Sequence, residues 1–305
     1  MLQKSLKIVE HAKIYWAISI LVILLGGIFL IVNGGFAMDI DFAGGMSMTV
    51  DFGEKAEGLN LDEVKDLVKE VAGASVGDPV VQRSDNNQVV IQTVTVENDI
   101  RDQIQNKILE KYELAPEAML ATDNVSATVG GELQAQAVQA TLIASLLMLL
   151  YISFRFEFKT GVAAIVALLH DCAIMLSFCA IFRIPLNTTL IAAILTIIGY
   201  SINNTIVVFD RVRENYKRAK HGNFNETVNN SVKQTLSRSI CTTITTLLPV
   251  VMLFALGVSS IRQFTIPLIV GLLAGTYSSV LLAAPVWAGL KKWQDKLKRR
   301  KLHKR

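Results

Sequence analysis

Apolar runs long enough to cross a lipid bilayer recur six times along the 305-residue chain. A helix that crosses a bilayer needs about 20 predominantly apolar residues. The runs contain almost no charged residues, whereas the segments between them are rich in charge. This pattern predicts six transmembrane helices, which we place at residues 14–36, 133–154, 160–182, 184–209, 238–261 and 263–290.

Residues 37–132 instead alternate short strand patterns with amphipathic helix patterns, as in a water-soluble domain. Helices are expected over Leu61–Ala72, with Asn60 as a capping residue, and around Ile100, Ile104 and Ile108. Strands are expected over the segments Met46–Phe52, Val80–Gln82, Gln88–Val96 and Val125–Val129. The order β-α-β-β-α-β predicts a ferredoxin-like α+β domain. The domain has no histidine and no set of residues typical of a catalytic site, so we expect a binding or mechanical role.

Composition and charge support a multi-pass membrane protein. With 51% hydrophobic and 18% charged residues, the chain is too apolar to be disordered. When the N-terminus is placed inside, the inner segments hold 21 basic residues and the outer ones 9. The positive-inside rule therefore predicts both termini and the loop at 210–237 in the cytoplasm, with the domain outside. The N-terminal segment 1–13 and the basic tail 291–305 then flank the membrane. The tail serves either as a topology anchor or as a contact for anionic lipid or an acidic partner.

The third span contains the adjacent pair His170 and Asp171. An acidic residue near the middle of a span costs about 2.5–3.5 kcal/mol on the insertion scale, so it must face other helices or a wet cavity. Asp171 is a candidate both for ion or proton handling and for a hydrogen bond between helices. Neighbours on a helix point about 100° apart, so the two side chains need not pair.

The fourth span carries a polar stripe. Tyr200 and Asn204 lie four residues apart on one face, Asn203 flanks them, and Gly199 is expected to allow a close approach of another helix. The stripe either joins helices by hydrogen bonds or takes part in ion handling.

The fifth span begins with Arg238, which can either reach the lipid headgroups or bond to an acceptor such as Asn204 or Asp171. Thr242, Thr245 and Thr246 follow on the same face, and Pro249 gives the helix a place to bend.

Glycines mark candidate packing and hinge positions. Gly271 and Gly275 in the sixth span have the spacing that lets helices pack closely. The pairs Gly34-Gly35 and Gly130-Gly131, at the two ends of the domain, are candidate hinges or simple turn residues.

Several ungapped motifs, in order along the predicted topology, resemble the SecF branch of the SecD/SecF family. The family is one of the RND-type transporters. The motifs are Ile40-Asp41-Phe42-Ala43-Gly44-Gly45, Val129-Gly130-Gly131-Glu132-Leu133, Phe154-Arg155-Phe156-Glu157, His170-Asp171, Ile198–Asn215, Leu236–Ser239 and Gly275-Thr276-Tyr277-Ser278-Ser279.

The resemblance implies a subunit of the bacterial Sec machinery in the cytoplasmic membrane. Such a subunit pairs with SecD to form half of an RND-like unit and associates with the SecYEG channel. It uses the ion gradient to help move a translocating polypeptide. No enzymatic activity, cofactor, metal or nucleic-acid partner is implied.

The chain departs from the family at one position. The family pattern commonly has aspartate where this chain has Asn204, and that aspartate is linked to ion passage together with the fifth-span arginine, here Arg238. Asn204 cannot take up or release a proton. Three possibilities follow: Asp171 or carboxylates of the partner carry the ion, the coupling ion is Na⁺ rather than H⁺, or coupling is weak or absent. A non-conducting scaffold and half of an RND-like exporter of lipids or small molecules are the alternative functions.

Overall fold

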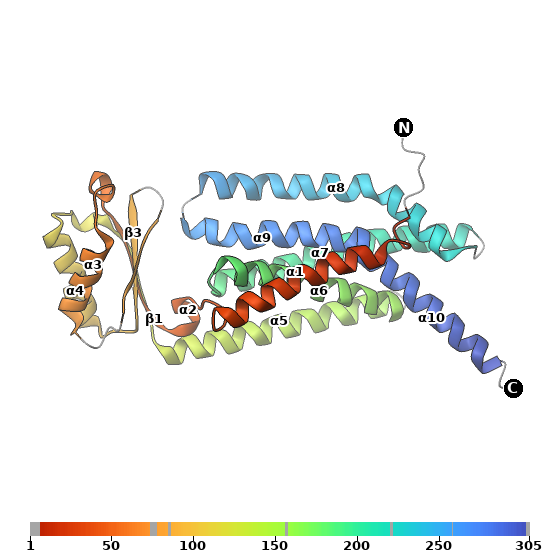
Figure 1. Cartoon of the computed structure of the whole chain (residues 1–305), viewed down its shortest axis with the longest axis horizontal. Helices are drawn as coiled ribbons and strands as arrows, with labels where there is room; N and C mark the ends of the chain where they lie inside the picture. Colours follow the sequence, from red (N-terminus) through yellow and green to blue (C-terminus); the bar gives the residue numbers. More distant parts are fainter. Residues whose placement is uncertain are drawn as a thin grey trace. The chain divides into compact units, whose positions relative to one another are not determined.

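The computed structural model describes residues 7–73, 78–84, 87–155, 158–219, 222–257 and 259–302 (Figure 1). Residues 1–6 and 303–305, which belong to the expected N-terminal segment and basic tail, lie outside the described residues. The chain divides into two compact units. One consists of Ala37–Gln139 and Pro185–Thr188, and the other of Met1–Phe36, Ala140–Ile184 and Thr189–Arg305.

The first unit contains a four-stranded antiparallel sheet in the order β2-β3-β1-β4. Its strands are β1 (Gly45–Asp51), β2 (Val80–Arg83), β3 (Gln88–Thr93) and β4 (Met119–Val125). Helices α3 (Leu61–Ala72) and α4 (Asn98–Lys111) connect strands, and α2 (Ile40–Ala43), η1 (Gly53–Ala56) and η3 (Pro116–Ala118) are short turns of helix. The order of elements and strands confirms the ferredoxin-like prediction.

The helix cap and the strand alternation expected from the sequence are both found in this unit. The Asn60 side chain accepts a hydrogen bond from the Asp62 backbone N–H and begins α3. On β1, Met46, Met48 and Val50 are all fully buried, while the residues between them face away. These side chains pack against Val64 and its neighbours on α3, so the core is almost entirely apolar.

The prediction for the last strand is wrong. The sequence suggested Val125–Val129, but β4 ends at Val125 and α5 (Ala127–Arg155) begins two residues later. The Ser126 hydroxyl accepts a hydrogen bond from the Val129 backbone N–H at 3.3 Å. This contact favours the start of a helix over a continued strand.

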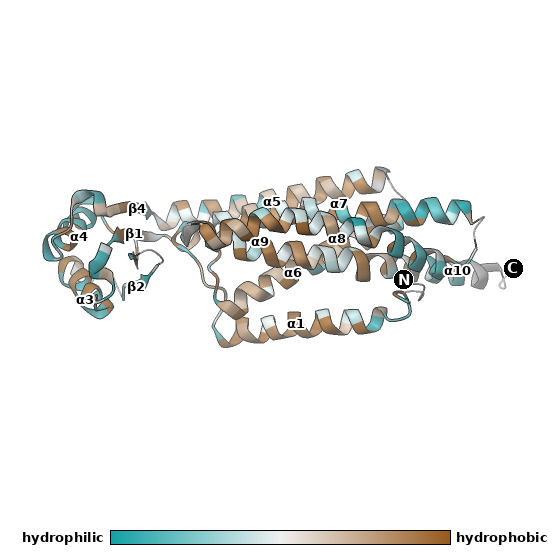
Figure 2. Cartoon of the chain, turned by 90° about the horizontal axis from the view of Figure 1, so that it is seen from above, coloured by the Kyte–Doolittle hydropathy of each residue, from teal (hydrophilic) through white to brown (hydrophobic). Residues whose placement is uncertain are grey.

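Six helices are long and apolar enough to cross a membrane, among the described residues. They are α1 (Ala12–Val32), α5, α6 (Phe158–Phe182), α7 (Thr188–Arg218), α8 (Phe224–Leu256) and the sixth, formed by α9 (Ser259–Ser278), η4 (Ser279–Ala283) and the beginning of α10 (Ala284–Leu302). Figure 2 shows hydrophobic residues predominating along α5 and α9, and hydrophilic residues along α10. Large apolar side chains such as Leu21 and Leu24 of α1 are 59% exposed, as expected for a surface that faces lipid.

Helices extend beyond the apolar spans. The segment 210–237, expected to be a loop, is mostly helical, because α7 continues to Arg218 and α8 begins at Phe224. Val212, Val228 and Val232 are fully buried, so the extensions are packed against the rest of the unit. The Asn223 side chain caps α8.

The second unit is a bundle whose helices approach closely. α1 packs on α6, and α9 contacts both α6 and α8. A Cβ atom on Gly26 of α1 would lie 2.3 Å from the Ser177 Cβ of α6. Such contacts between small residues are typical of helices packed within a membrane. The sixth span also contains a single π-helical turn, η4, directly after Ser278.

Candidate functional site

Asp171 of α6 is completely buried in the bundle. Its carboxylate accepts hydrogen bonds from the Ser201 hydroxyl of α7 and, at 2.8 Å, from the Ser278 hydroxyl of α9. Its other oxygen lies 2.9 Å from Nδ1 of His170. The sequence analysis did not require the adjacent pair to meet. In the structure the two side chains turn toward each other, because a buried carboxylate needs every available donor.

His170 extends this cluster to α1. Its Nε2 lies 2.8 Å from the Ser19 hydroxyl, and its ring stacks on Tyr277 at 6.0 Å between centroids. Ser19 also lies 3.1 Å from the backbone carbonyl of Tyr15. Since a hydroxyl has one proton, Ser19 can donate either to the imidazole or to that carbonyl. The same positions of the heavy atoms therefore fit both a neutral and a protonated His170.

The cluster of Ser19, His170, Asp171, Ser201 and Ser278, which we call the Asp171 cluster, joins four helices. Each member is at least 95% buried, although each is polar. Such groups are costly inside a membrane unless they are partnered, and here they partner one another. The π-helical turn η4 begins immediately after Ser278, and turns of this kind are frequent at functional sites.

A second polar contact joins α7, α8 and α9. The Tyr200 hydroxyl donates to Thr243 at 2.9 Å, and the Thr243 and Thr276 hydroxyls lie 2.6 Å apart. The threonines that the sequence singled out on α8 do not take part. Thr242, Thr245 and Thr246 bond to backbone carbonyls of their own helix.

One turn further along α7, polar groups are buried without partners. The amide nitrogen of Asn204 and the hydroxyls of Thr205 and Ser239 are each buried and make no hydrogen bond within the described part of the chain. α7 and α8 run antiparallel, and Tyr200 contacts Thr243. One turn toward their connection therefore brings Asn204 level with Ser239. Asn203 is exposed.

Arg238 does not bond to either of the acceptors considered for it. Among the described residues, its guanidinium makes no hydrogen bond to Asn204 or Asp171, and its side chain is exposed. Arg238 instead lines a cavity of about 320 Å³, together with Val207, Asp210, Arg211, Glu214, Gln234 and Thr235. Arg211 is bound to Glu214 at 2.7 Å and to Gln234 at 2.6 Å. The arginine therefore lines a cavity that holds both acidic and basic side chains, and it does not reach the interior of the bundle.

The glycines differ in what surrounds them. A Cβ atom on Gly271 would lie 1.9 Å from Cδ1 of Ile197, and one on Gly275 would lie 3.1 Å from Cβ of Ser201, so both support close packing of α9 on α7. The expected close approach at Gly199 is wrong, because a Cβ atom there would meet nothing within 4 Å. Ile197 and Ser201, which lie on the buried face of α7, instead approach the glycines of α9.

Conformation explains the glycines at one end of the domain. Gly34 and Gly35 have φ angles of +69° and +120°, which other residues rarely adopt, so they are needed for the turn that ends α1. Gly130 lies 2.9 Å, measured from a Cβ atom built on it, from the Phe42 carbonyl, whereas Gly131 meets nothing. α8 is helical through Pro249, which is exposed.

Several members of these contacts could not be found from the sequence. Ser19, Thr243 and Gly26 carried no signal, because isolated small polar residues and single glycines are common in membrane helices. Thr276 and Ser278 follow the Gly271 and Gly275 pair, for which the sequence favoured helix packing alone. Among the described residues, no group of three His, Cys, Asp or Glu side chains is placed to hold a metal ion.

Comparisons with known proteins agree with this architecture. The family model for the protein export membrane protein SecD/SecF, C-terminal, matches residues 90–293. The protein translocase subunit SecF of Sebaldella termitidis is 35% identical over 300 residues, which cover 97% of this chain and 96% of that protein. The protein translocase subunit SecDF of Bacillus subtilis is 39% identical over 282 residues, which are 91% of this chain but only 37% of that protein.

A solved structure has the same fold. The crystal structure of SecDF from Thermus thermophilus, described as a translocon-associated membrane protein, superposes with a TM-score of 0.84 at 32% sequence identity. The match covers 96% of this chain and 39% of that one, so the chain spans well under half of the SecDF proteins that it matches. The extent of these matches shows that the chain belongs to the SecD/SecF family of protein export membrane proteins.

Proposed function

We propose that the chain is the SecF-type subunit of a protein translocase, a transport component rather than an enzyme. It would pair with a SecD-type half to form the complete unit. The SecDF relatives support this pairing, since they match the chain over only 37–39% of their own length. Association with the SecYEG channel and contact with the translocating polypeptide are part of the same proposal.

We propose the orientation with both termini in the cytoplasm and the domain 37–132 outside. The short loops carry the evidence, because the cytoplasmic ends of α7 and α8 and the tail are strongly basic. In this orientation the ferredoxin-like domain lies on the side where a polypeptide emerges.

The Asp171 cluster is the observation that supports the proposal of ion coupling. It is a titratable pair buried among four helices, and its hydrogen bonds hold α1, α6, α7 and α9 together. Protonation of Asp171 would remove the charge that the Ser201 and Ser278 hydroxyls stabilise, and would favour a different packing of these helices. Moving one charge across the membrane potential yields about 2.3 kcal/mol per 100 mV, which is enough to bias two packing states.

With Asn204 in place of an acidic residue, the contact of α7 with α8 has a role other than proton transfer. An amide cannot carry a proton, and the Arg238 side chain is exposed and lines the cavity that contains Asp210 and Glu214. Proton transfer in this chain is therefore assigned to Asp171 rather than to Asn204. A sodium ion could use the Asn204 amide oxygen as a ligand, and a scaffold would need no ion at all.

Export of a secretory protein into membrane vesicles tests the proposal. We expect Asp171→Asn to assemble with its partner as the wild type does, and to lose the part of export that depends on the ion gradient. Ser177→Ala is the matched control, because Ser177 is also buried in α6 but bonds only to the Ala173 carbonyl of its own helix. The control should keep gradient-dependent export.

A wild-type response of Asp171→Asn to the gradient would remove the Asp171 cluster from ion coupling. If wild-type export itself does not respond to a proton or sodium gradient, the chain acts as a scaffold. Copurification with a SecD-type partner and the channel would still support membership in the complex.

A further inference from the structure

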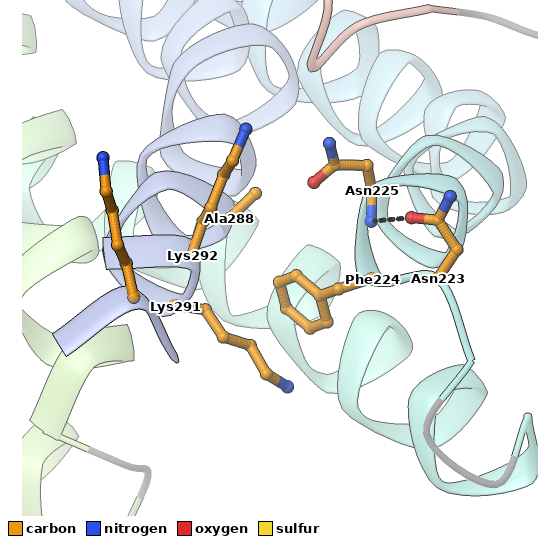
Figure 3. A pocket seen from close by; sticks show the side chains of 7 residues that line it. Asn223, Phe224, Asn225, Ala288, Lys291 and Lys292 are labelled. Atoms are coloured by element: carbon orange, nitrogen blue, oxygen red, sulfur yellow. Dashed lines mark hydrogen bonds between the residues drawn. The ribbon is translucent and has the colours of Figure 1, made fainter. Parts of the chain in front are cut away.

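A basic cavity of about 510 Å³ lies between the beginning of α8 and the middle of α10 (Figure 3). Three lysines from α10, Lys291, Lys292 and Lys296, line it together with Asn223, Phe224, Asn225 and Ala288. Figure 3 shows the residues of α10 on one side of the cavity and those of α8 on the other. No acidic residue is among the side chains that the structure describes in its lining.

An aromatic cluster holds the walls of this cavity in place. The Lys291 ammonium lies 3.5 Å from the centre of the Tyr216 ring and 4.0 Å from that of Phe224. Phe224 also packs edge-on against Tyr216 at 5.0 Å and Trp287 at 5.3 Å between ring centroids. α7, α8 and α10 are thus joined at one point, so the lysines project from a preformed surface.

Two of the lysine charges remain available. The Lys292 and Lys296 side chains are exposed, and neither forms an ion pair with an acidic residue whose side chain the structure describes. On the opposite wall the Asn223 side chain caps α8 by accepting from the Asn225 backbone N–H at 3.1 Å. The positive end of a 33-residue helix therefore adds to the positive potential of the lysines.

The position of the lysines on the sixth span fits the depth of lipid headgroups. The helix that forms the sixth span runs to Gln294, and its apolar sequence ends at Leu290, directly before the first lysine, Lys291. From Lys291 to Lys296 the helix rises about 7.5 Å. The headgroup region on each side of a bilayer is about 5–8 Å thick. The three ammonium groups thus span the layer in which phosphates lie, and Phe224 and Ala288 provide apolar surface beside them.

We propose that this cavity binds the phosphate headgroup of an anionic phospholipid. The lipid would connect α8 and α10 at the cytoplasmic surface of the membrane. The inference depends on the six-span architecture and is independent of ion coupling at Asp171.

Native mass spectrometry of the full chain, released from detergent and titrated with phosphatidylglycerol, tests the proposal. The variant K292Q/K296Q removes two charges from the cavity. We expect its affinity for phosphatidylglycerol to fall about 30-fold, since each lysine near an anionic surface contributes about 1 kcal/mol. K298Q/K301Q is the matched control, because it removes the same charge from a later part of the same helix. It should lose less than about threefold. Equal thermal melting of the variants shows that both are folded.

Three results would overturn the assignment. Equal weakening by both pairs would mean a diffuse attraction to the basic tail and no site. Equal binding of phosphatidylcholine would mean that the negative charge is not recognised. Displacement of the lipid by inorganic phosphate at a similar concentration would mean that the cavity takes a soluble anion.

Discussion

Two successive turns of α7 differ in whether their buried polar groups have hydrogen-bond partners. At Ser201 the hydroxyl donates to the Asp171 carboxylate, and Gly275 of α9 packs against the same residue. One turn further, the amide of Asn204 and the hydroxyl of Thr205 are buried without partners. The first turn is built around a buried negative charge. The second has donors but no charge to accept from them.

The difference indicates what has changed at the second turn. A carboxylate only accepts hydrogen bonds, so at position 204 it would have no donor left unpaired. An amide at that position retains an N–H group that finds no acceptor. The second turn therefore resembles a site for an acidic side chain that is occupied by an amide side chain instead. Four variants test this comparison, from the largest expected effect to the smallest.

Gly271→Leu should disrupt the packing of α9 on α7 beside the first turn, which contains Ser201. A Cβ atom at Gly271 already lies 1.9 Å from Ile197, so a larger side chain must separate α9 from α7. We expect little folded protein, measured as recovery after gel filtration in detergent. Gly199→Leu is the control, since nothing lies within 4 Å of that position. Equal recovery of the two variants would contradict the close packing of α7 on α9.

Ser201→Ala should weaken the first turn without separating the helices. It removes one donor from a buried carboxylate, and a hydrogen bond to a charged group contributes about 1.5–3 kcal/mol. We expect a lower thermal midpoint and a lower gradient-dependent export. Thr196→Ala provides the control, because the Thr196 hydroxyl bonds only to the Ala192 carbonyl of its own helix. A Ser201→Ala variant as stable as the control would show that Asp171 does not need this donor.

Asn204→Asp should make the second turn resemble the first. The introduced carboxylate has no donor to leave unpaired and, unlike the amide, the carboxyl group can change its charge. A charge that crosses about half of a 100 mV potential gains about 1 kcal/mol, so gradient-dependent export should rise about fivefold. Asn203→Asp introduces the same group at the exposed neighbour and should have no effect. If the two variants respond alike to collapse of the gradient, the second turn is not an acidic site.

Thr243→Val should produce the smallest effect. It removes the hydroxyl that joins Tyr200 to Thr276, and hydrogen bonds between membrane helices contribute on average about 0.6 kcal/mol. The thermal midpoint should fall slightly. Thr242→Val is the control on the same helix, where the hydroxyl bonds to the Arg238 carbonyl. A larger loss in the control would mean that the contact with Tyr200 contributes nothing.

Much of the fold could be predicted from the sequence. Apolar runs located the spans, because a bilayer requires a minimum length of apolar helix whatever the rest of the protein does. Alternation located β1 and β3, and the cap at Asn60 located the beginning of α3. The wrong predictions concern boundaries, such as the beginning of α5 and the helical extensions of α7 and α8, where polar residues continue a helix beyond the membrane.

The site could be predicted only in part. The charge of Asp171 and the amide of Asn204 are conspicuous in apolar sequence. The rotation of a span about its own axis cannot be predicted from the sequence, because apolar residues surround the span on all sides. For that reason Thr242 and Thr243 could not be distinguished, and Ser19 and Ser278 could not be assigned to Asp171. Arg238 had the residue type of an ion partner but lies where only the tertiary structure could place it.

The π-helical turn η4 gives the sixth span one residue more per turn than an ordinary helix has at that point. If a change at Ser278 let this turn tighten to normal geometry, α10 would revolve by about 100° and advance by about 1.5 Å. Lys292 and Lys296 would then swing away from the start of α8. The gain or loss of a proton deep among the helices would thereby rotate α10 at the membrane surface.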